Sequence, residues 1–274
     1  MHEPLNLEIE IGVNPTTPQY WYQYISEHNA ESYVAAYREI LSYEYPLSKC
    51  LNNSRSLLDI ARISSRQGTS LLNKVSQARP VVKDPLAFFS AEWLSNQFNM
   101  QVLMLIRHPA AFCSSLKIKN WTFDFMHFTN QPELMERYLT PFKSEILAFA
   151  GQRENIIEQA ILLWNCIHHV AKFYQEIHQD WYCVRHEDLS LDPLNNFKTI
   201  FSIFGLEFTL KSEKAILEST GSHNPTEQVP GNEFVRDSKA NVKNWKRRLS
   251  EDEIELIKQK TFPVWTSFYT ESDW

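Results

Sequence analysis

Three short apolar runs, each ending on a cation, constrain the fold of this chain more than any other feature. They lie in RPVVKDP, QVLMLIRHP and WYCVRHEDL, and their cations are Lys83, Arg107 and Arg185. Long helical patterns separate them. β-rich runs that alternate with helices are typical of parallel βαβ units. The sequence therefore predicts an α/β fold, with a doubly wound parallel sheet and helices on both of its faces.

The segments between these runs carry helical periodicity. Long helices are predicted over residues 85–98, 132–150 and 153–179. Residues 1–78 are predicted to be mostly helical, with Thr17 as the N-cap of a first helix and Pro18 at its first position. Ser250 and Glu253 have the spacing of a capping box, which predicts the start of a final helix.

The charge balance decides which partners the whole surface could attract. The 27 basic and 33 acidic residues give a net charge of −6, so no general field favours nucleic acid or an acidic membrane. No run approaches the roughly 18 apolar residues of a membrane span, and the first residues do not resemble a signal peptide. Four cysteines without C-x-x-C spacing favour reduced thiols. We expect a cytoplasmic protein in which any anion site is local.

The strand-end cations predict where that site lies. In open parallel sheets, ligands bind outside the carboxyl ends of the strands, and three cations there predict an anionic ligand. Each cation could instead pair with a local acid: Lys83 with Asp84, and Arg185 with one of the two acids that follow His186. Arg107 has no acid nearby in the sequence, so it is the strongest candidate.

The residues after Arg107 predict a helix that begins at the strand end. Pro109 suits a first helical turn, whose free N–H groups favour anions, and Ala110 and Ala111 would let a ligand approach closely. Ser115 follows Ala111 by one helical turn on the same face, and helical side chains lean toward the N-terminus. Arg107 and Ser115 are therefore predicted to grip one phosphate together.

At this point the chain resembles a family. LIRHPAAFCSSL is similar to the motif with which sulfotransferases hold the 3′-phosphate of 3′-phosphoadenosine 5′-phosphosulfate, the sulfuryl donor. VVKDPLAFFSAEWL and CVRHEDLSLDPLNNFKTIFSIFGLEF resemble flanking segments of the family. The resemblance covers residues 1–250 in patches. It implies a helix-rich, P-loop-NTPase-like sulfotransferase fold with a three-layer parallel sheet, formed as a single domain over residues 1–274.

The resemblance also implies binding residues. Arg107 and Ser115 would bind the 3′-phosphate of the donor. SKANVKNWKRRLS resembles the RKG…WK loop of the cytosolic enzymes, which touches the same phosphate. Lys239 and Trp245 match that loop, whereas Ser238 stands where the family has an arginine. The acceptor would be a hydroxyl or amine on a small molecule or glycan, and no metal is implied.

The catalytic residues are implied in the same way. HEPLNL resembles the Glu-Pro pair that carries the catalytic base in bacterial members, so Glu3 would be the base, with an exposed terminal carboxylate as the alternative. Lys83 would stabilise the leaving group or the moving sulfuryl. Pro85 stands where the cytosolic enzymes have their catalytic histidine. Asp84 is either a substitute base or a helix cap.

One part of the family pattern is missing. No glycine lies in a phosphate-cradling GxxxxGK[ST] loop, and SSRQGTSLL at residues 64–72 matches the family loop only in letters, because its spacing predicts a helix. We therefore expect the first βα unit to be missing. The alternative function is that of a catalytically inactive remnant that binds a partner. A nucleotide kinase is disfavoured, since it would need a Walker loop.

Other candidate residues are weaker. His168 and His169 lie within a predicted helix without a ligand-like spacing, so a metal site is not expected. His186 stands where the family usually has a tyrosine, and either adenine contact or packing would suit it. The aromatic stretch at residues 121–128 could line an acceptor pocket, but aromatic stretches more often belong to the core.

Overall fold

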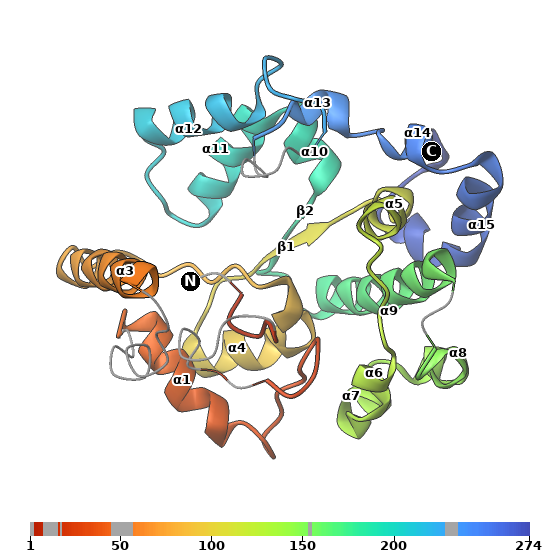
Figure 1. Cartoon of the computed structure of the whole chain (residues 1–274), viewed down its shortest axis with the longest axis horizontal. Coiled ribbons are helices and arrows are strands. Elements are labelled where there is room, and N and C mark those ends of the chain that lie inside the picture. Colours follow the sequence, from red (N-terminus) through yellow and green to blue (C-terminus); the bar gives the residue numbers. More distant parts are fainter. Residues whose placement is uncertain (1–2, 8–15, 17, 45–56, 153–154, 228–234) are drawn as a thin grey trace. The chain divides into compact units, whose positions relative to one another are not determined.

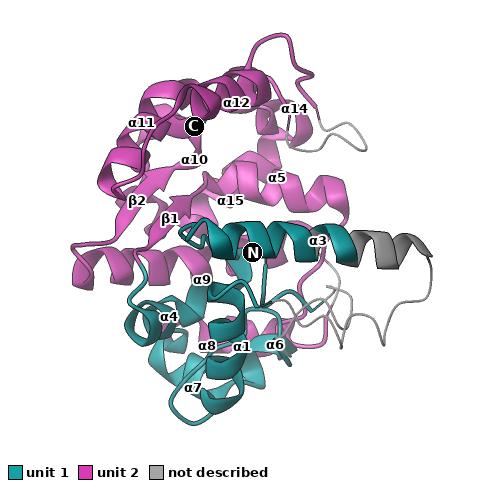
Figure 2. Cartoon of the chain, turned by 90° about the vertical axis from the view of Figure 1, so that its left-hand side faces the viewer, with its two compact units in different colours: residues 1–100, 126–140 teal, residues 101–125, 141–274 magenta. Residues whose placement is uncertain are grey.

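The computed structural model describes residues 3–7, 16, 18–44, 57–152, 155–227 and 235–274. The chain divides into two compact units, one formed by residues 1–100 and 126–140 and the other by residues 101–125 and 141–274 (Figure 2). We call them unit 1 and unit 2 and describe each by itself. The single domain predicted over residues 1–274 stays a prediction, since one domain can contain two compact units.

Unit 2 contains a parallel sheet of two strands, β1 (Leu103–Ile106) and β2 (Tyr182–Arg185) (Figure 1). The register places Leu103 beside Tyr182 and Ile106 beside Arg185. Both strands and their parallel pairing confirm the prediction from the apolar runs. The two strand-end arginines therefore leave the sheet at neighbouring positions, because the strands run in the same direction.

The third predicted strand, over residues 79–83, is wrong. This segment is extended, but Lys83 is its single bridge position, and Val81 is 65% exposed. The Glu3 N–H donates to the Lys83 carbonyl at 2.7 Å, and Asp84 ends the extended run by capping a helix. Among the described residues the sheet has two strands, so the fold is a helix-rich α/β arrangement and the predicted three-layer sheet is not seen.

Unit 2 is otherwise helical. Its α-helices are α5 (Pro109–Lys119), α8 (Lys143–Phe149), α9 (Ile156–Ile177), α10 (His186–Leu191), α11 (Pro193–Ile203), α12 (Leu210–Thr220), α13 (Ser238–Asn241), α14 (Trp245–Arg248) and α15 (Glu251–Thr261). The core lies where α5, α9, α14 and α15 pack together, around Cys113, Ile161, Trp245 and Ile257. The predicted capping box of α15 is confirmed, with Ser250 and Glu253 bonded reciprocally.

The α-helices described in unit 1 are α1 (Glu31–Leu41), α3 (Leu57–Val75), α4 (Ala91–Phe98), α6 (Met126–Thr129) and α7 (Pro132–Arg137). Its core surrounds Leu5, Ile25, Tyr37 and Leu94. Residues 64–72 lie within α3, which confirms that the glycine-containing RQGTS segment is helical rather than a phosphate loop.

Short 3-10 helices complete the described structure: η1 (Pro85–Ser90) in unit 1, η2 (Thr140–Phe142) at a boundary between the units, and η3 (Val264–Ser267) and η4 (Glu271–Asp273) in unit 2. The predicted helix over residues 132–150 is therefore three separate pieces, α7, η2 and α8. The proline at 141 accounts for the break, because proline disfavours helical backbone at the residue before it.

The helix predicted from Pro18 does not begin there. Thr17 lies outside the described residues, and α1 starts only at Glu31. Between them, polar side chains take the backbone N–H groups that a helix would use: Gln131 accepts from Tyr24 at 2.7 Å, and Ser90 accepts from Ile25 at 2.9 Å. Within the described residues, no helix is long and apolar enough to cross a membrane.

Candidate anion-binding site

Arg107 lies at the junction between β1 and α5, as the sequence predicts. Its backbone carbonyl accepts a hydrogen bond from the indole N–H of Trp164 on α9 at 2.9 Å, which fixes the end of the strand. Its side-chain Nε is buried, and among the described residues this atom has no hydrogen-bond partner. A buried donor without a partner costs free energy, about 1–3 kcal/mol, so this guanidinium is poised for an acceptor.

Charges of both signs act on Arg107: two arginines and the acid Glu187. Burial lowers the pKa of Arg107; Glu187 opposes this shift, whereas Arg236 and Arg248 add to it. The Glu187 carboxylate is already engaged, since it accepts from the His108 N–H at 3.1 Å and from the Tyr269 hydroxyl at 2.8 Å. No ion pair joins Arg107 to a carboxylate in the described part of the chain. The surroundings therefore favour an anion.

Arg236 and Arg248 come from the segment around α13 and α14. The Arg236 N–H donates to the Ser219 carbonyl at 3.0 Å, which ties this segment to the end of α12. Arg248 pairs with Glu227, and its side chain is 21% exposed. These two arginines were missed in the sequence analysis. For Arg248 the basic run KNWKRR was the available signal, whereas Arg236 lies outside that run. Only the tertiary structure shows that both charges act on Arg107.

The other predicted phosphate ligands also lie in unit 2. Ser115 is half-buried in the second turn of α5, and Lys239 is exposed on α13. Ser238, which replaces the family arginine, donates its hydroxyl to the Ser190 carbonyl at 2.7 Å and so joins α13 to α10. On α5 the Ser114 hydroxyl is buried, and it has no partner among the described residues.

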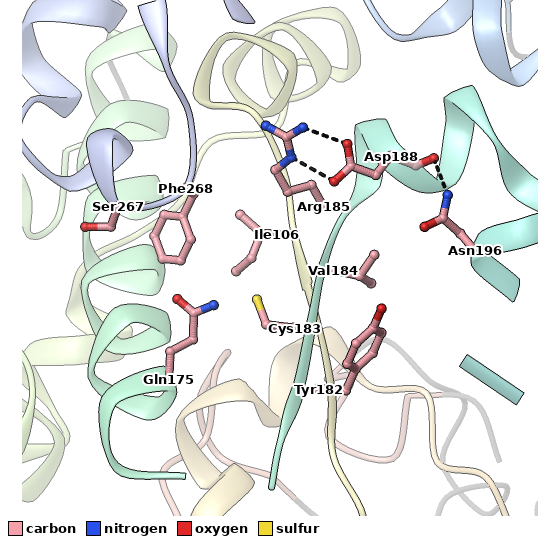
Figure 3. Close-up of a pocket in the computed structure, with 10 residues that line it drawn as sticks. All are labelled: Ile106, Gln175, Tyr182, Cys183, Val184, Arg185, Asp188, Asn196, Ser267 and Phe268. Atoms are coloured by element: carbon pink, nitrogen blue, oxygen red, sulfur yellow. Dashed lines mark hydrogen bonds and ion pairs between the residues drawn. The ribbon is translucent and has the colours of Figure 1, made fainter. Parts of the chain in front are cut away.

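Arg185, at the end of β2, is neutralised. Its guanidinium donates to both carboxylate oxygens of Asp188, at 2.9 and 2.6 Å, and it also approaches Asp273 at 3.4 Å. Figure 3 shows the bidentate pair. This confirms that a local acid pairs with Arg185. Bidentate arginine–carboxylate pairs are among the stronger ion pairs, so Arg185 is a poor candidate for an anionic ligand.

A pocket of about 270 Å³ lies beside β2 (Figure 3). It is lined by side chains of β2 together with Gln175 of α9, Asn196 of α11, and Ser267 and Phe268 after α15. The one cation in its lining, Arg185, is held by Asp188. Burial raises the pKa of the Cys183 thiol to about 11, so this thiol stays protonated. Arg107 is not among the residues that line this pocket.

Glu3 and Lys83, the predicted catalytic pair, meet in unit 1. The Lys83 ammonium forms an ion pair with one Glu3 carboxylate oxygen, and the Asn6 amide donates to the other at 2.8 Å. The Glu3 side chain is only 18% exposed, whereas that of Lys83 is 56% exposed. Glu3 is thus a held carboxylate rather than an exposed terminal one, and Lys83 pairs with it instead of with Asp84.

Asp84 acts as a helix cap. Its carboxylate accepts from the backbone N–H groups of Leu86 at 2.9 Å and of Leu5 at 2.6 Å. Burial raises the pKa of Asp84 to about 6, while these backbone donors oppose the shift. The capping interpretation is confirmed, because both carboxylate oxygens already serve the backbone of unit 1.

The weaker candidates are packing residues. His168 stacks on Trp164 with ring centroids 4.0 Å apart, its Nδ1 meets the Trp164 carbonyl at 2.9 Å, and burial lowers its pKa to about 3. In the aromatic stretch at residues 121–128, Phe123, Phe125 and Phe128 are buried and belong to the core, whereas Trp121 is 60% exposed. Within the described residues, no group of three or more side chains is arranged to hold a metal ion.

Three comparisons with known proteins gave one match, to a solved structure. No protein-family model matches the chain, and no curated protein matches it in sequence. A solved structure described as "Sulfotransferase Domain from the Curacin Biosynthetic Pathway" matches 81% of this chain and 78% of its own, with 15% sequence identity and a TM-score of 0.41. A similarity at this level carries no argument about function, so any functional proposal depends on the residues of this chain.

Proposed function

We propose that this protein is a sulfotransferase, which moves a sulfuryl group from 3′-phosphoadenosine 5′-phosphosulfate to a hydroxyl or amine acceptor. The observation that carries the proposal is the Arg107 guanidinium. It lies between a strand end and a helix start, with a buried Nε that has no partner among the described residues and with two further arginines nearby. This arrangement suits a phosphate dianion, which accepts several charge-assisted hydrogen bonds.

The proposed donor-binding residues lie in unit 2. Arg107 and Ser115 would bind the 3′-phosphate at the start of α5, where the free N–H groups of the first helical turn favour negative charge. Arg236 and Arg248 would add positive charge that the missing family arginine at position 238 does not supply. Lys239, being exposed, would contribute a weaker and more strongly screened attraction.

The proposed catalytic residues lie in unit 1. The acceptor oxygen or nitrogen attacks sulfur while the bond from sulfur to the 5′-phosphate oxygen breaks, and Glu3 takes the proton of the acceptor. Lys83 would stabilise the moving sulfuryl or the departing phosphate. Its ion pair with Glu3 holds the carboxylate in place before the acceptor arrives. No step in this scheme requires a metal ion.

The first experiment is a calorimetric titration with 3′-phosphoadenosine 5′-phosphate, the product nucleotide. We expect micromolar binding that Arg107→Ala weakens by about 10- to 150-fold, the value of a charged hydrogen bond of roughly 1.5–3 kcal/mol. Arg185→Ala is the matched control, because that strand-end cation is already neutralised. Adenosine 5′-phosphate, which lacks the 3′-phosphate, should bind the wild type and Arg107→Ala equally.

Two results would contradict the assignment. If Arg107→Ala binds the product nucleotide as tightly as the wild type does, Arg107 has another role. If the wild type binds no nucleotide, the chain is better explained as a remnant of a sulfotransferase fold that has no donor site.

Turnover tests the residues of unit 1. Mass spectrometry would follow sulfation of a panel of phenols, alcohols and amines. Glu3→Gln should abolish product formation while the product nucleotide binds with nearly unchanged affinity, since only proton transfer is lost. Retained turnover in this variant would exclude Glu3 as the base.

A further inference from the structure

Within the described ranges, β2 pairs with β1 on one side and with no strand on its outer edge. The Tyr182 N–H donates to the Val102 carbonyl at 3.0 Å, so the backbone of Tyr182 faces β1. Backbone direction alternates along a strand, and the N–H and C=O of Cys183 therefore point away from β1. Among the described residues, no backbone hydrogen bond to Cys183 is formed on that side.

The pocket beside β2 lies along this same edge. Its lining includes Cys183 and Arg185 from one face of the strand and Tyr182 and Val184 from the other (Figure 3). Successive side chains of a strand point to opposite faces, so a hollow that reaches both pairs must pass around the edge. The described residues of unit 2 thus leave a hollow along this edge of the sheet.

The strand itself lacks two of the residue types that normally prevent strand pairing. Native proteins protect edges with lysine, proline, bulges or covering loops. The segment WYCVR contains neither lysine nor proline, and its one charge, on Arg185, is neutralised by Asp188 and Asp273. A two-stranded sheet is also marginal by itself, and further strands would stabilise it.

The segment is complementary to itself about a two-fold axis. Antiparallel pairing centred on Cys183 places the two Cys183 residues opposite each other, where they exchange both backbone hydrogen bonds. Tyr182 then lies opposite Val184 of the second copy. An aromatic residue opposite a β-branched one is a favourable cross-strand pair, and the symmetry forms it twice.

The same axis keeps like charges apart. Arg185 lies opposite Trp181 of the second copy, so the two Arg185 side chains are separated by the length of the paired segment. A parallel third strand in register would instead place equivalent residues beside each other, with the two arginines adjacent. Like charges placed directly opposite destabilise a sheet, so the antiparallel arrangement is the better one.

We infer that a second copy of this chain pairs with the outer edge of β2, so that two β1–β2 sheets join into one four-stranded sheet. The interface is isologous and closes on itself, as most homodimer interfaces do. This inference is independent of the proposed sulfuryl transfer, because Tyr182 and Cys183 belong to neither proposed site.

Sedimentation equilibrium of the full chain tests the dimer directly, and amide hydrogen exchange tests its location. The expected result is a reversible dimer in which exchange at residues 182–185 becomes slower as protein concentration rises. The exchange measurement uses the wild-type chain and so does not depend on any variant folding. A chain that stays monomeric at its solubility limit would overturn the inference.

Substitution of Tyr182 locates the contact. Tyr182 is only half-buried, and Tyr182→Lys places a protecting charge on the edge, which should weaken dimerisation about tenfold because two cross-strand pairs are lost. Leu210→Lys is the matched control, since Leu210 is an 86% exposed apolar residue on α12. Mixing Tyr182→Lys chains with Tyr182→Glu chains should restore a mixed dimer. A dimer unaffected by Tyr182→Lys would place the interface elsewhere.

Discussion

An Arg-His dipeptide stands at the end of both strands of unit 2, yet the two ends differ in what they can bind. β1 ends at Ile106 and is followed by Arg107-His108, whereas β2 ends at Arg185 and is followed by His186. The helix after β2 begins with His-Glu-Asp, and Asp188 holds Arg185 in a bidentate pair. The helix after β1 begins with Pro-Ala-Ala and supplies no acid. A cation at a strand end is therefore available to a ligand only where the following helix turn does not neutralise it.

The largest expected effect comes from removing the support of the β1 end. Trp164 is fully buried, donates to the Arg107 carbonyl and stacks on His168. Trp164→Ala should lower the free energy of unfolding by about 3–5 kcal/mol, because it leaves a large cavity. Urea unfolding measures this change. Trp121→Ala, at a 60% exposed position, should change stability by no more than about 0.5 kcal/mol, and an equal loss in both variants would refute the argument.

Glu187 connects the two strand ends, since it belongs to the helix after β2 and its charge acts on Arg107. Glu187→Gln removes a charged acceptor from the His108 N–H and the Tyr269 hydroxyl, so stability should fall by about 1–3 kcal/mol. The product nucleotide should bind more tightly, because the opposing charge is gone. Glu218→Gln, at an exposed position, is the control. Weaker nucleotide binding would show that Glu187 positions the site instead.

Acid should lower the free energy of unfolding through two histidines, one beside each strand end. Burial lowers the pKa of His108 to about 3 and of His186 to about 4, below the ordinary value of 6.5. Between the lowered pKa of each histidine and 6.5, the unfolded chain binds a proton that the folded chain does not bind. The stability that comes from keeping these histidines neutral is therefore fully present above pH 6.5. It is lost as the pH falls toward 3, at about 1.4 kcal/mol per pH unit for each histidine. Asp84 acts in the opposite direction, because its pKa is raised to about 6.

A substitution separates the contribution of one histidine. His108→Phe retains the stacking on Trp245 but removes the titrating ring. Unfolding measured between pH 4 and 7 should therefore depend less steeply on pH, by about one proton. An unchanged slope would mean that His108 is not the group that titrates.

The smallest effect is expected at the β2 end. Arg185 and its partner Asp188 are each about one third exposed, so solvent screens their pair. Arg185→Gln should lower stability by about 0.2–1 kcal/mol and leave nucleotide binding unchanged. Thermal unfolding and the calorimetric titration measure the two quantities. If this variant loses nucleotide binding, Arg185 also serves the ligand, and the contrast between a neutralised and an available strand-end arginine is wrong.

The sequence by itself determined the features that depend on neighbouring residues. The two strand segments, the helix after Arg107, the capping box at Ser250 and the helical RQGTS segment all follow from local patterns, and the structure confirms them. The pairing of Arg185 with an acid three residues later belongs to the same class. These features are predictable because the interacting groups lie within one or two helical turns.

The tertiary structure decided the features whose partners are distant in the chain. Lys83 pairs with Glu3, 80 positions away, rather than with its neighbour Asp84. Tyr24 and Ile25 bond to Gln131 and Ser90 instead of forming a helix. Such contacts leave no periodic signal in the sequence, because they depend on how separate elements pack.

The charges around Arg107 follow the same rule. The sequence shows that no acid lies beside Arg107, but Arg236, Arg248 and Glu187 reach its surroundings from segments 80 to 141 positions away. The potential at a buried group is a sum over everything that folding brings near it. The sequence therefore indicates where a cation is free of local pairing, and the tertiary structure decides which charges it meets.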